Sequence, residues 1–215
     1  MPCAAPSFLA AKGYSEMTRA PSERFCACRK LVDDDAFEAQ IAAHMATPLI
    51  SGELSKLKRD RYWVGVFLRR ALVRYLAIVL SRLLEKPGEG STGVTASISS
   101  LLDMAKSEGV LDKGQIRHFT SEFKKIKAAA AKGEYDLVNA LRKLRTIQLA
   151  HSLVPWNSST DDVQGHHLIE FAETIFDFVM NLDKALTEAI GVGLVSREAA
   201  KAFRASAGKF WQALT

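Results

Sequence analysis

The sequence has few cysteines and no long apolar run that is free of charged residues. Its three cysteines, Cys3, Cys26 and Cys28, all lie near the N-terminus, and this distribution argues against a disulfide framework. Two cysteines in a Cys-x-Cys arrangement supply too few ligands for a structural zinc, so we expect reduced, mobile thiols, no metal site and no cofactor. The longest apolar segment, residues 63–84, contains four arginines, which is not typical of a membrane span.

The N-terminal stretch also lacks the basic and apolar regions of a signal peptide. A length of 215 residues suffices for one well-buried core but not for two full domains. The formal net charge of +5 permits a nucleic-acid partner without requiring one. These features predict a cytoplasmic, single-domain protein with no membrane partner.

Prolines and small polar residues without periodicity occupy residues 1–32, and we interpret this stretch as a flexible tail. The acidic run Asp33, Asp34 and Asp35 suits the positive end of a helix dipole. The sequence therefore predicts a single helical domain from residue 33 to residue 215, with its first helix ending before Pro48.

Helical spacing of apolar residues recurs along this domain, and no segment has the alternation typical of a strand. The expected helices span about 33–47, 60–86, 95–107, 113–132, 134–152, 165–190 and 196–215. Phe171 and Phe178 widen the apolar face of the sixth helix, so it should pack on two sides. Together these segments predict an all-α helical bundle of about seven helices.

Two groups of basic residues fall on these helices. Arg70, Arg74 and Arg82 lie opposite the apolar stripe of helix 60–86, where a solvated face explains them and a basic ligand-binding surface is the alternative. The second group lies near the end of helix 113–132, where favourable interaction of cations with the helix dipole suffices to explain it; its members are Lys124, Lys125, Lys127 and Lys132.

One helix carries polar residues where its pattern calls for apolar ones. The apolar stripe of helix 134–152 begins Leu137, Leu141, Leu144, and its next two positions are Gln148 and His151. Polar side chains on an apolar face are costly unless they serve a purpose. This helix end is therefore the candidate site.

Positive charge gathers around the same turn. Arg145 follows Leu144 by one residue, which is about 100° around the helix. Arg142 and Lys143 precede it by one turn or less. The eight residues 144–151, Leu-Arg-Thr-Ile-Gln-Leu-Ala-His, resemble the signature of the HEPN superfamily, most closely its branch related to abortive-infection phage-defence proteins.

That resemblance implies a HEPN-like bundle and a metal-independent RNA endonuclease of a phage-defence or toxin–antitoxin system, with an antitoxin protein as a further partner. Arg145 and His151 would be the catalytic pair, with Gln148, Thr146, Arg142 and Lys143 supporting them or binding substrate. Thr146 departs from the family pattern, because a small polar Asn or Asp, or a His, usually follows the arginine. The departure keeps open an alternative function, a catalytically inactive helical module that binds a protein or nucleotide partner.

The chemistry suits these residue types. A histidine can move the proton of an RNA 2′-hydroxyl near neutral pH, and a guanidinium can hold the phosphate in a fork. Six residues of helix separate Arg145 from His151 by about 9 Å of rise and 120°. A homodimer that joins two helix ends would overcome this offset, and the broad apolar face of helix 165–190 also favours a dimer. The alternative is that His151 is a structural residue interacting with the helix dipole.

Overall fold

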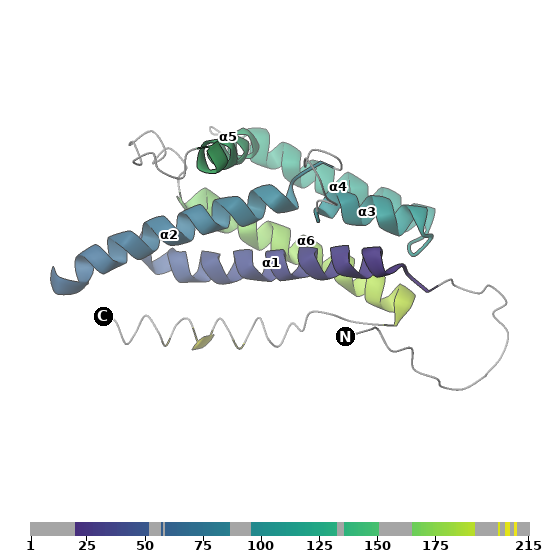
Figure 1. The fold of residues 1–215 in the computed structure, drawn as a ribbon, viewed down its shortest axis with the longest axis horizontal. Coiled ribbons are helices and arrows are strands. Elements are labelled where there is room, and N and C mark those ends of the chain that lie inside the picture. Colours follow the sequence, from purple (N-terminus) through teal and green to yellow (C-terminus); the bar gives the residue numbers. More distant parts are fainter. Residues whose placement is uncertain are drawn as a thin grey trace.

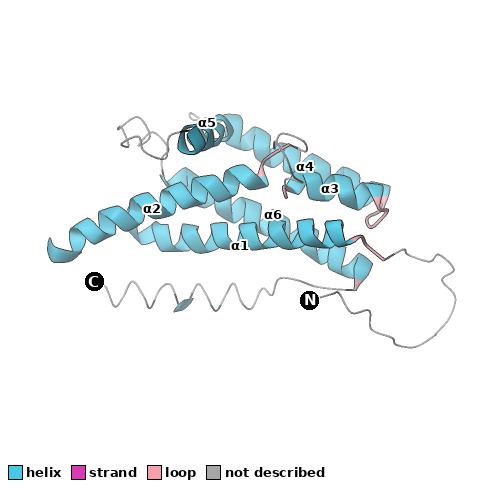
Figure 2. Ribbon diagram, viewed as in Figure 1, coloured by secondary structure: helices cyan, strands magenta, loops and turns pink. Residues whose placement is uncertain are grey.

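The structure is a computed structural model that describes residues 20–51, 57, 59–86, 96–132, 136–150 and 165–191, with the single positions 202, 205, 206 and 209. The side chains of residue 60 and of residues 144–150 lie outside this description. The described part folds as a bundle of six α-helices without strands (Figures 1 and 2). The helices are α1 (Glu23–Ile50), α2 (Arg59–Leu83), α3 (Ile98–Ser107), α4 (Lys113–Lys132), α5 (Leu137–Ala150) and α6 (Gly165–Ile190).

Helix α1 is the centre of the bundle. It packs along α2 and α6 and also contacts α3, while α5 packs on α2 and α4 (Figure 1). Helices α1 and α6 run antiparallel, since Gly165 at the start of α6 lies against Ile50 at the end of α1. A Cβ atom on Gly165 would stand 2.5 Å from Ile50 Cδ1, so the absence of a side chain permits this close approach.

The helix ends follow from local sequence signals. Ser22 and Ser97 cap α1 and α3 by accepting hydrogen bonds from the amides of Phe25 and Ser100. Gly109 ends α3 with φ of +70°, a conformation that glycine adopts without steric cost. These short-range signals explain why most of the predicted helices appear close to their expected positions.

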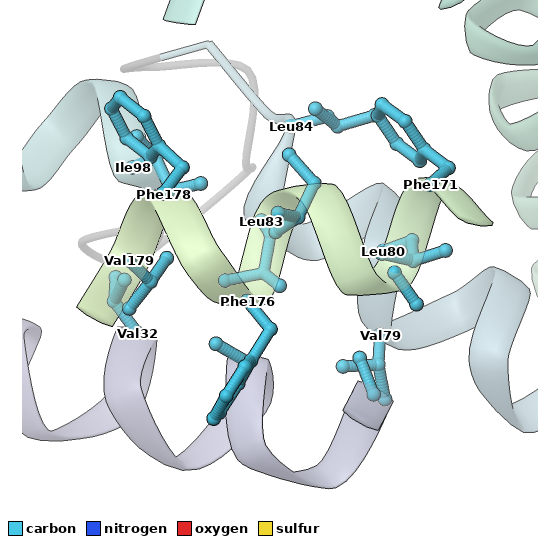
Figure 3. Close-up of a cluster of buried hydrophobic side chains, with 14 of the residues drawn as sticks. Val32, Val79, Leu80, Leu83, Leu84, Ile98, Phe171, Phe176, Phe178 and Val179 are labelled. Atoms are coloured by element: carbon cyan, nitrogen blue, oxygen red, sulfur yellow. The ribbon is translucent and has the colours of Figure 1, made fainter. Parts of the chain in front are cut away.

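The core forms between α1, α2 and α6. Figure 3 shows Val32 of α1, Leu80 and Leu83 of α2, and Phe176 and Val179 of α6 gathered between these helices. The predicted stripe of α6 is confirmed, because all six of its members are buried: Leu168, Ala172, Ile175, Val179, Leu182 and Leu186. Phe171 and Phe178 are buried as well. Helix α6 therefore packs on two sides within its own chain, and its apolar face gives no support to a dimer.

The first helix differs most from the sequence prediction. It begins at Glu23 rather than near Asp33, and it continues through Pro48 to Ile50. Phe25, Cys28 and Val32 are buried in the core. The prediction that residues 1–32 form a flexible tail is therefore wrong for residues 23–32, because these side chains are part of the core of the bundle. Residues 1–19 lie outside the described residues.

The second half of the buried face of α1 is made mostly of alanines. Phe37, Ile41 and Met45, which were expected to face the core, are only half-buried. The fully buried face carries small side chains at helical spacing, Ala36, Ala39, Ala42, Ala43 and Ala46. Small residues allow α2 and α6 to approach the α1 backbone closely. The spacing of large apolar residues therefore predicted a face of α1 that lies next to the buried one.

The seventh predicted helix, 196–215, falls mostly outside the described residues. Four of its positions, Ala202, Ala205, Ser206 and Lys209, are helical and exposed. No helix in the described ranges combines the length and apolarity that crossing a bilayer requires.

Candidate functional site

The predicted site lies at the C-terminal end of α5. Helix α5 reaches Ala150, so Arg145, Thr146 and Gln148 are on the helix as expected. Leu137 and Leu141, the first two members of the predicted apolar stripe, are buried as expected. The side chains of Arg145, Thr146 and Gln148 lie outside the description, as does all of His151.

Arg142 and Lys143 are the predicted site residues whose side chains the structure describes. Both are exposed on α5. Arg142 lies close enough to Lys127 of α4 for the two charges to repel each other, and Lys86 and Lys124 add to that repulsion. We call Lys86, Lys124, Lys127 and Arg142 the basic cluster. It combines residues from α4, α5 and the segment that follows α2.

Lys127 is held at the centre of this cluster. Its ammonium Nζ lies 4.4 Å from the ring centroid of Phe123, and this ring is buried and stacks on Phe178 of α6. The contact combines packing of the aliphatic stem with a cation–π interaction. Lys127 therefore presents its charge from a fixed position rather than from a freely moving side chain.

The electrostatic environment of Lys127 disfavours its own charge. Partial burial lowers its pKa from the usual lysine value, and the positive charges of Arg142, Lys86 and Lys124 lower it further. Cations that repel one another in this way create a positive potential that attracts an anion. Interaction with the dipole of α4 does not explain the positions of Lys124 and Lys127. Helix α4 continues to Lys132, and this is the lysine in its last turn.

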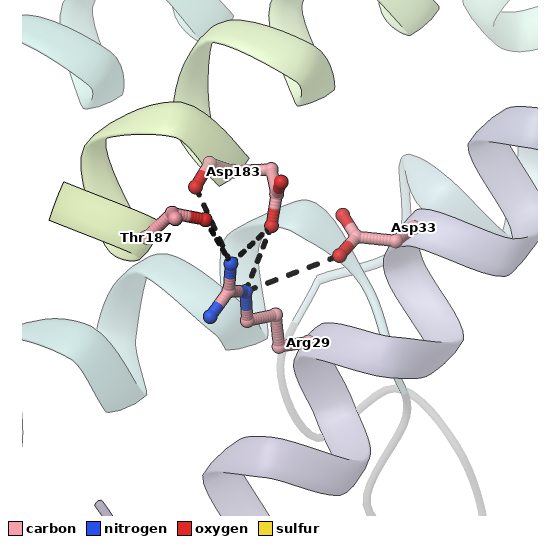
Figure 4. A network of polar contacts seen from close by, with 4 residues as sticks. All are labelled: Arg29, Asp33, Asp183 and Thr187. Atoms are coloured by element: carbon pink, nitrogen blue, oxygen red, sulfur yellow. Dashed lines mark hydrogen bonds and ion pairs between the residues drawn. The ribbon is translucent and has the colours of Figure 1, made fainter. Parts of the chain in front are cut away.

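A second polar group, which the sequence interpretation missed, is buried between α1 and α6. Arg29, only 1% exposed, donates from Nε to Asp183 Oδ1 at 2.9 Å and from Nη2 to Thr187 Oγ1 at 2.7 Å (Figure 4). Nη2 also donates to both the carboxylate and the backbone carbonyl of Asp183. Asp33 lies on the other side of the guanidinium, with Oδ2 at 4.0 Å from Nε.

Asp33 is the member of this group whose charged form is disfavoured. Burial and the negative charge of Asp183 together raise its pKa to about 8, against the lowering effect of Arg29. Its Oδ2 atom has no hydrogen-bond partner among the described residues. At neutral pH the site therefore holds one ion pair and one largely protonated carboxyl. We interpret the group as a structural contact that joins α1 to α6, since Arg29, Asp33 and Asp183 are all buried where these two helices meet (Figure 4).

The acidic run also has a different role from the predicted one. Because α1 begins at Glu23, Asp33, Asp34 and Asp35 lie about three turns inside the helix and not at its positive end. Asp34 pairs with Lys30 on the surface, and Asp35 pairs with Arg82 of α2 at 2.5 Å. A signal for Asp33 was available, because Arg29 and Asp33 share the helical face of Phe25, Cys28 and Val32.

Cysteine and histidine positions give no metal site in the described ranges. Cys28 is a core residue rather than a mobile thiol, and burial raises its pKa to about 11. No group of three or more Cys, His, Asp or Glu side chains among the described residues is arranged to hold a metal ion.

Comparisons of the chain with protein-family models, with curated proteins and with solved structures found no match. The described residues define the class of the protein as an all-α helical bundle.

Proposed function

We propose that the protein binds RNA at the basic cluster and cleaves it without a metal ion through Arg145 and His151. The observation that supports this proposal is the basic cluster itself, because it brings Lys127 of α4 beside Arg142 of α5. Arg142 precedes Arg145 by three residues, or about one helical turn. A phosphate bound at the cluster would therefore lie close to the helix turn that carries the catalytic arginine.

The roles of the residues follow from their chemistry. The lysines of the cluster hold the phosphate backbone by charge, which positions an RNA without selecting its sequence. His151 accepts the proton of the 2′-hydroxyl as its oxygen attacks the adjacent phosphorus. The P–O5′ bond breaks, and the leaving 5′-oxygen takes up a proton, so the products are a 2′,3′-cyclic phosphate and a 5′-hydroxyl. Arg145 binds the reacting phosphate and stabilises the charge that develops on it. Gln148, Thr146 and Lys143 support the pair, and a homodimer brings two such helix ends together. An antitoxin protein would restrain the activity in the HEPN-like version of this function.

The decisive test is incubation of the purified chain with total RNA in EDTA, beside the variants His151→Ala and Arg145→Ala. We expect cleavage by the wild-type chain and its loss in both variants. Unchanged cleavage in His151→Ala would refute the catalytic assignment. RNA binding without cleavage would favour the inactive binding module, the alternative that Thr146 supports.

Binding is tested separately from cleavage. The double variant Lys124→Ala/Lys127→Ala should bind single-stranded RNA more weakly. The dependence of log affinity on log salt concentration should become shallower by about 0.7 for each lost phosphate contact. Lys30→Ala/Lys184→Ala is the charge-matched control, because both lysines are exposed and each pairs with a carboxylate on its own helix. An equal effect of the control would show that only net charge matters and would remove the basic cluster as the binding site.

A further inference from the structure

Helix α2 carries a second apolar stripe that faces away from the core. Val64, Phe67, Tyr75 and Ile78 are 55%, 69%, 42% and 38% exposed. Together with Ala71 they follow helical spacing and lie within about 40° of one direction on the helix. The buried stripe of Leu76, Val79 and Leu83 points about 115° away from this direction. We call the exposed set the outer stripe.

The outer stripe borders α1. Tyr75 donates a hydrogen bond to Glu38 of α1, and Arg82, one turn beyond Ile78, donates to Asp35. Leu31 is 51% exposed and lies on the same face of α1 as Asp35 and Glu38, since the three are spaced by four and three residues. Exposed apolar side chains thus continue across the seam between the two helices. A contiguous exposed apolar patch with charged residues at its edge is typical of an interaction surface.

The chain itself contains a segment with a matching face. The sequence of residues 196–215 places Ala199, Phe203, Ala207, Phe210 and Leu214 on one stripe of a helix. The four described positions of this segment are helical and exposed, and they lie about 60° to 160° around the helix from that stripe. The described exposed positions therefore lie off the apolar stripe of this segment.

The lengths agree as well. Arg29 of α1 contacts Asp183 and Thr187, so α6 ends near the first turns of α1, and Gly191 follows with φ of +76°. The outer stripe lies beside the second half of α1, from the level of Asp35 and Glu38 onward. The distance along α1 from Arg29 to Met45 is about 24 Å, and a helix of 20 residues measures about 30 Å. A helix that turned back after Gly191 would cover most of the outer stripe.

Charge distinguishes this occupant from a second copy of the chain. Helix α2 has six arginines and one aspartate, so two α2 helices packed on each other would bring like charges together. Residues 196–215 are also basic, with four cations and one glutamate. Unlike a second α2, however, this segment would lie on the seam, where α1 contributes Asp34, Asp35 and Glu38, of which the first two already pair with Lys30 and Arg82.

We propose that residues 196–215 form an amphipathic helix that packs on the outer stripe of α2 along its seam with α1, with Phe203, Phe210 and Leu214 covering Phe67, Tyr75 and Ile78. This inference is independent of the proposed RNA cleavage. It assigns the outer stripe to an intramolecular contact and makes the C-terminal segment part of the folded bundle.

The test is hydrogen exchange of the full chain, measured by mass spectrometry on peptides covering α2 residues 62–80. The variant Phe203→Glu/Phe210→Glu should speed exchange in these peptides on the order of tenfold, because the covering helix is released. Exchange in α6 peptides and the helical circular dichroism should stay near wild type, which shows that the bundle remains folded. The matched control is Ala202→Glu/Ala205→Glu, two glutamates on the exposed face of the same segment, and it should leave α2 exchange unchanged.

The reciprocal variant Phe67→Glu should speed exchange in peptides from residues 196–215. Equal α2 exchange in wild type and in Phe203→Glu/Phe210→Glu would overturn the proposal. So would wild-type protection of α2 that disappears on dilution, since this would identify a second copy as the occupant. Protection that appears only with vesicles containing phosphatidylserine would assign the stripe to an anionic lipid surface and would equally overturn it.

Discussion

Replacement of Asp33 by asparagine should remove a large part of the pH dependence of stability. The side chain is buried between α1 and α6, and burial together with the charge of Asp183 raises its pKa to about 8. The ordinary value is 3.8. Between these two values the native state holds one proton more at this position than the unfolded state does. Stability must therefore fall as pH rises from about 4 to about 8.

The magnitude follows from the linkage relation. Each pH unit in this window costs about 1.4 kcal/mol of unfolding free energy, so the wild-type chain should lose about 3 kcal/mol between pH 5 and pH 7 through Asp33 alone. Asparagine has the same shape, cannot ionise and can donate its amide to Asp183. The variant should match the wild type at pH 5 and exceed it at pH 7.

Urea unfolding followed by circular dichroism at pH 5, 6, 7 and 8 measures this difference. Asp34→Asn is the control, because Asp34 is the neighbouring residue on α1 but is exposed and paired with Lys30. It should change the slope by only a few tenths of a kcal/mol. Parallel curves for the wild type and Asp33→Asn would show that Asp33 is already ionised in the native state at pH 5 and would refute the reasoning.

Three further substitutions test the fold by chemical denaturation. Phe25→Ala should cost about 3–5 kcal/mol because the ring is fully buried, whereas Leu31→Ala on the exposed face should cost far less; equal effects would restore the flexible-tail interpretation. Ala39→Leu should cost about 1–3 kcal/mol of stability, because it forces closely packed helices apart. Ala128→Leu on the exposed face of α4 is the control and should be nearly neutral. A neutral Ala39→Leu would contradict close packing at α1. Gly109→Ala should cost about 1 kcal/mol because its φ is +70°, and Gly109→Asn should cost less since asparagine tolerates this conformation; a larger loss for asparagine would count against backbone strain as the cause.

The sequence predicted helices well where large apolar residues mark the buried face. Leu168, Ile175 and Leu182 of α6 identified both the helix and its core side, and Ile98 and Leu101 did the same for α3. Helix α1 failed on both counts. Charged Arg29 and Asp33 interrupt the first half of its buried face, and alanines make up most of the second half. Hydrophobic periodicity therefore predicted a start that is too late and a neighbouring face.

The candidate site was predictable only along the helix that carries it. The sequence placed Arg142 and Lys143 on α5 beside the motif, and both are exposed there. Nothing local to α5 indicates that Lys86 and Lys127 lie near Arg142, because the packing of α4 and α5 determines that proximity. The same limit applies to Arg29, whose partners Asp183 and Thr187 are more than 150 residues away along the chain.

This last separation has a consequence for how the chain folds during synthesis. Helices α1 and α2 leave the ribosome first and can pair at once, but Asp183 follows Arg29 by 154 residues. At bacterial or eukaryotic elongation rates this interval lasts roughly 10 to 30 seconds. During this interval Arg29 lacks its partners on α6, and its guanidinium must stay hydrated. The buried face of α1 therefore cannot complete its packing. Completion of the bundle waits for α6, and a chain released before residue 183 would expose that face to the quality-control machinery of the cell.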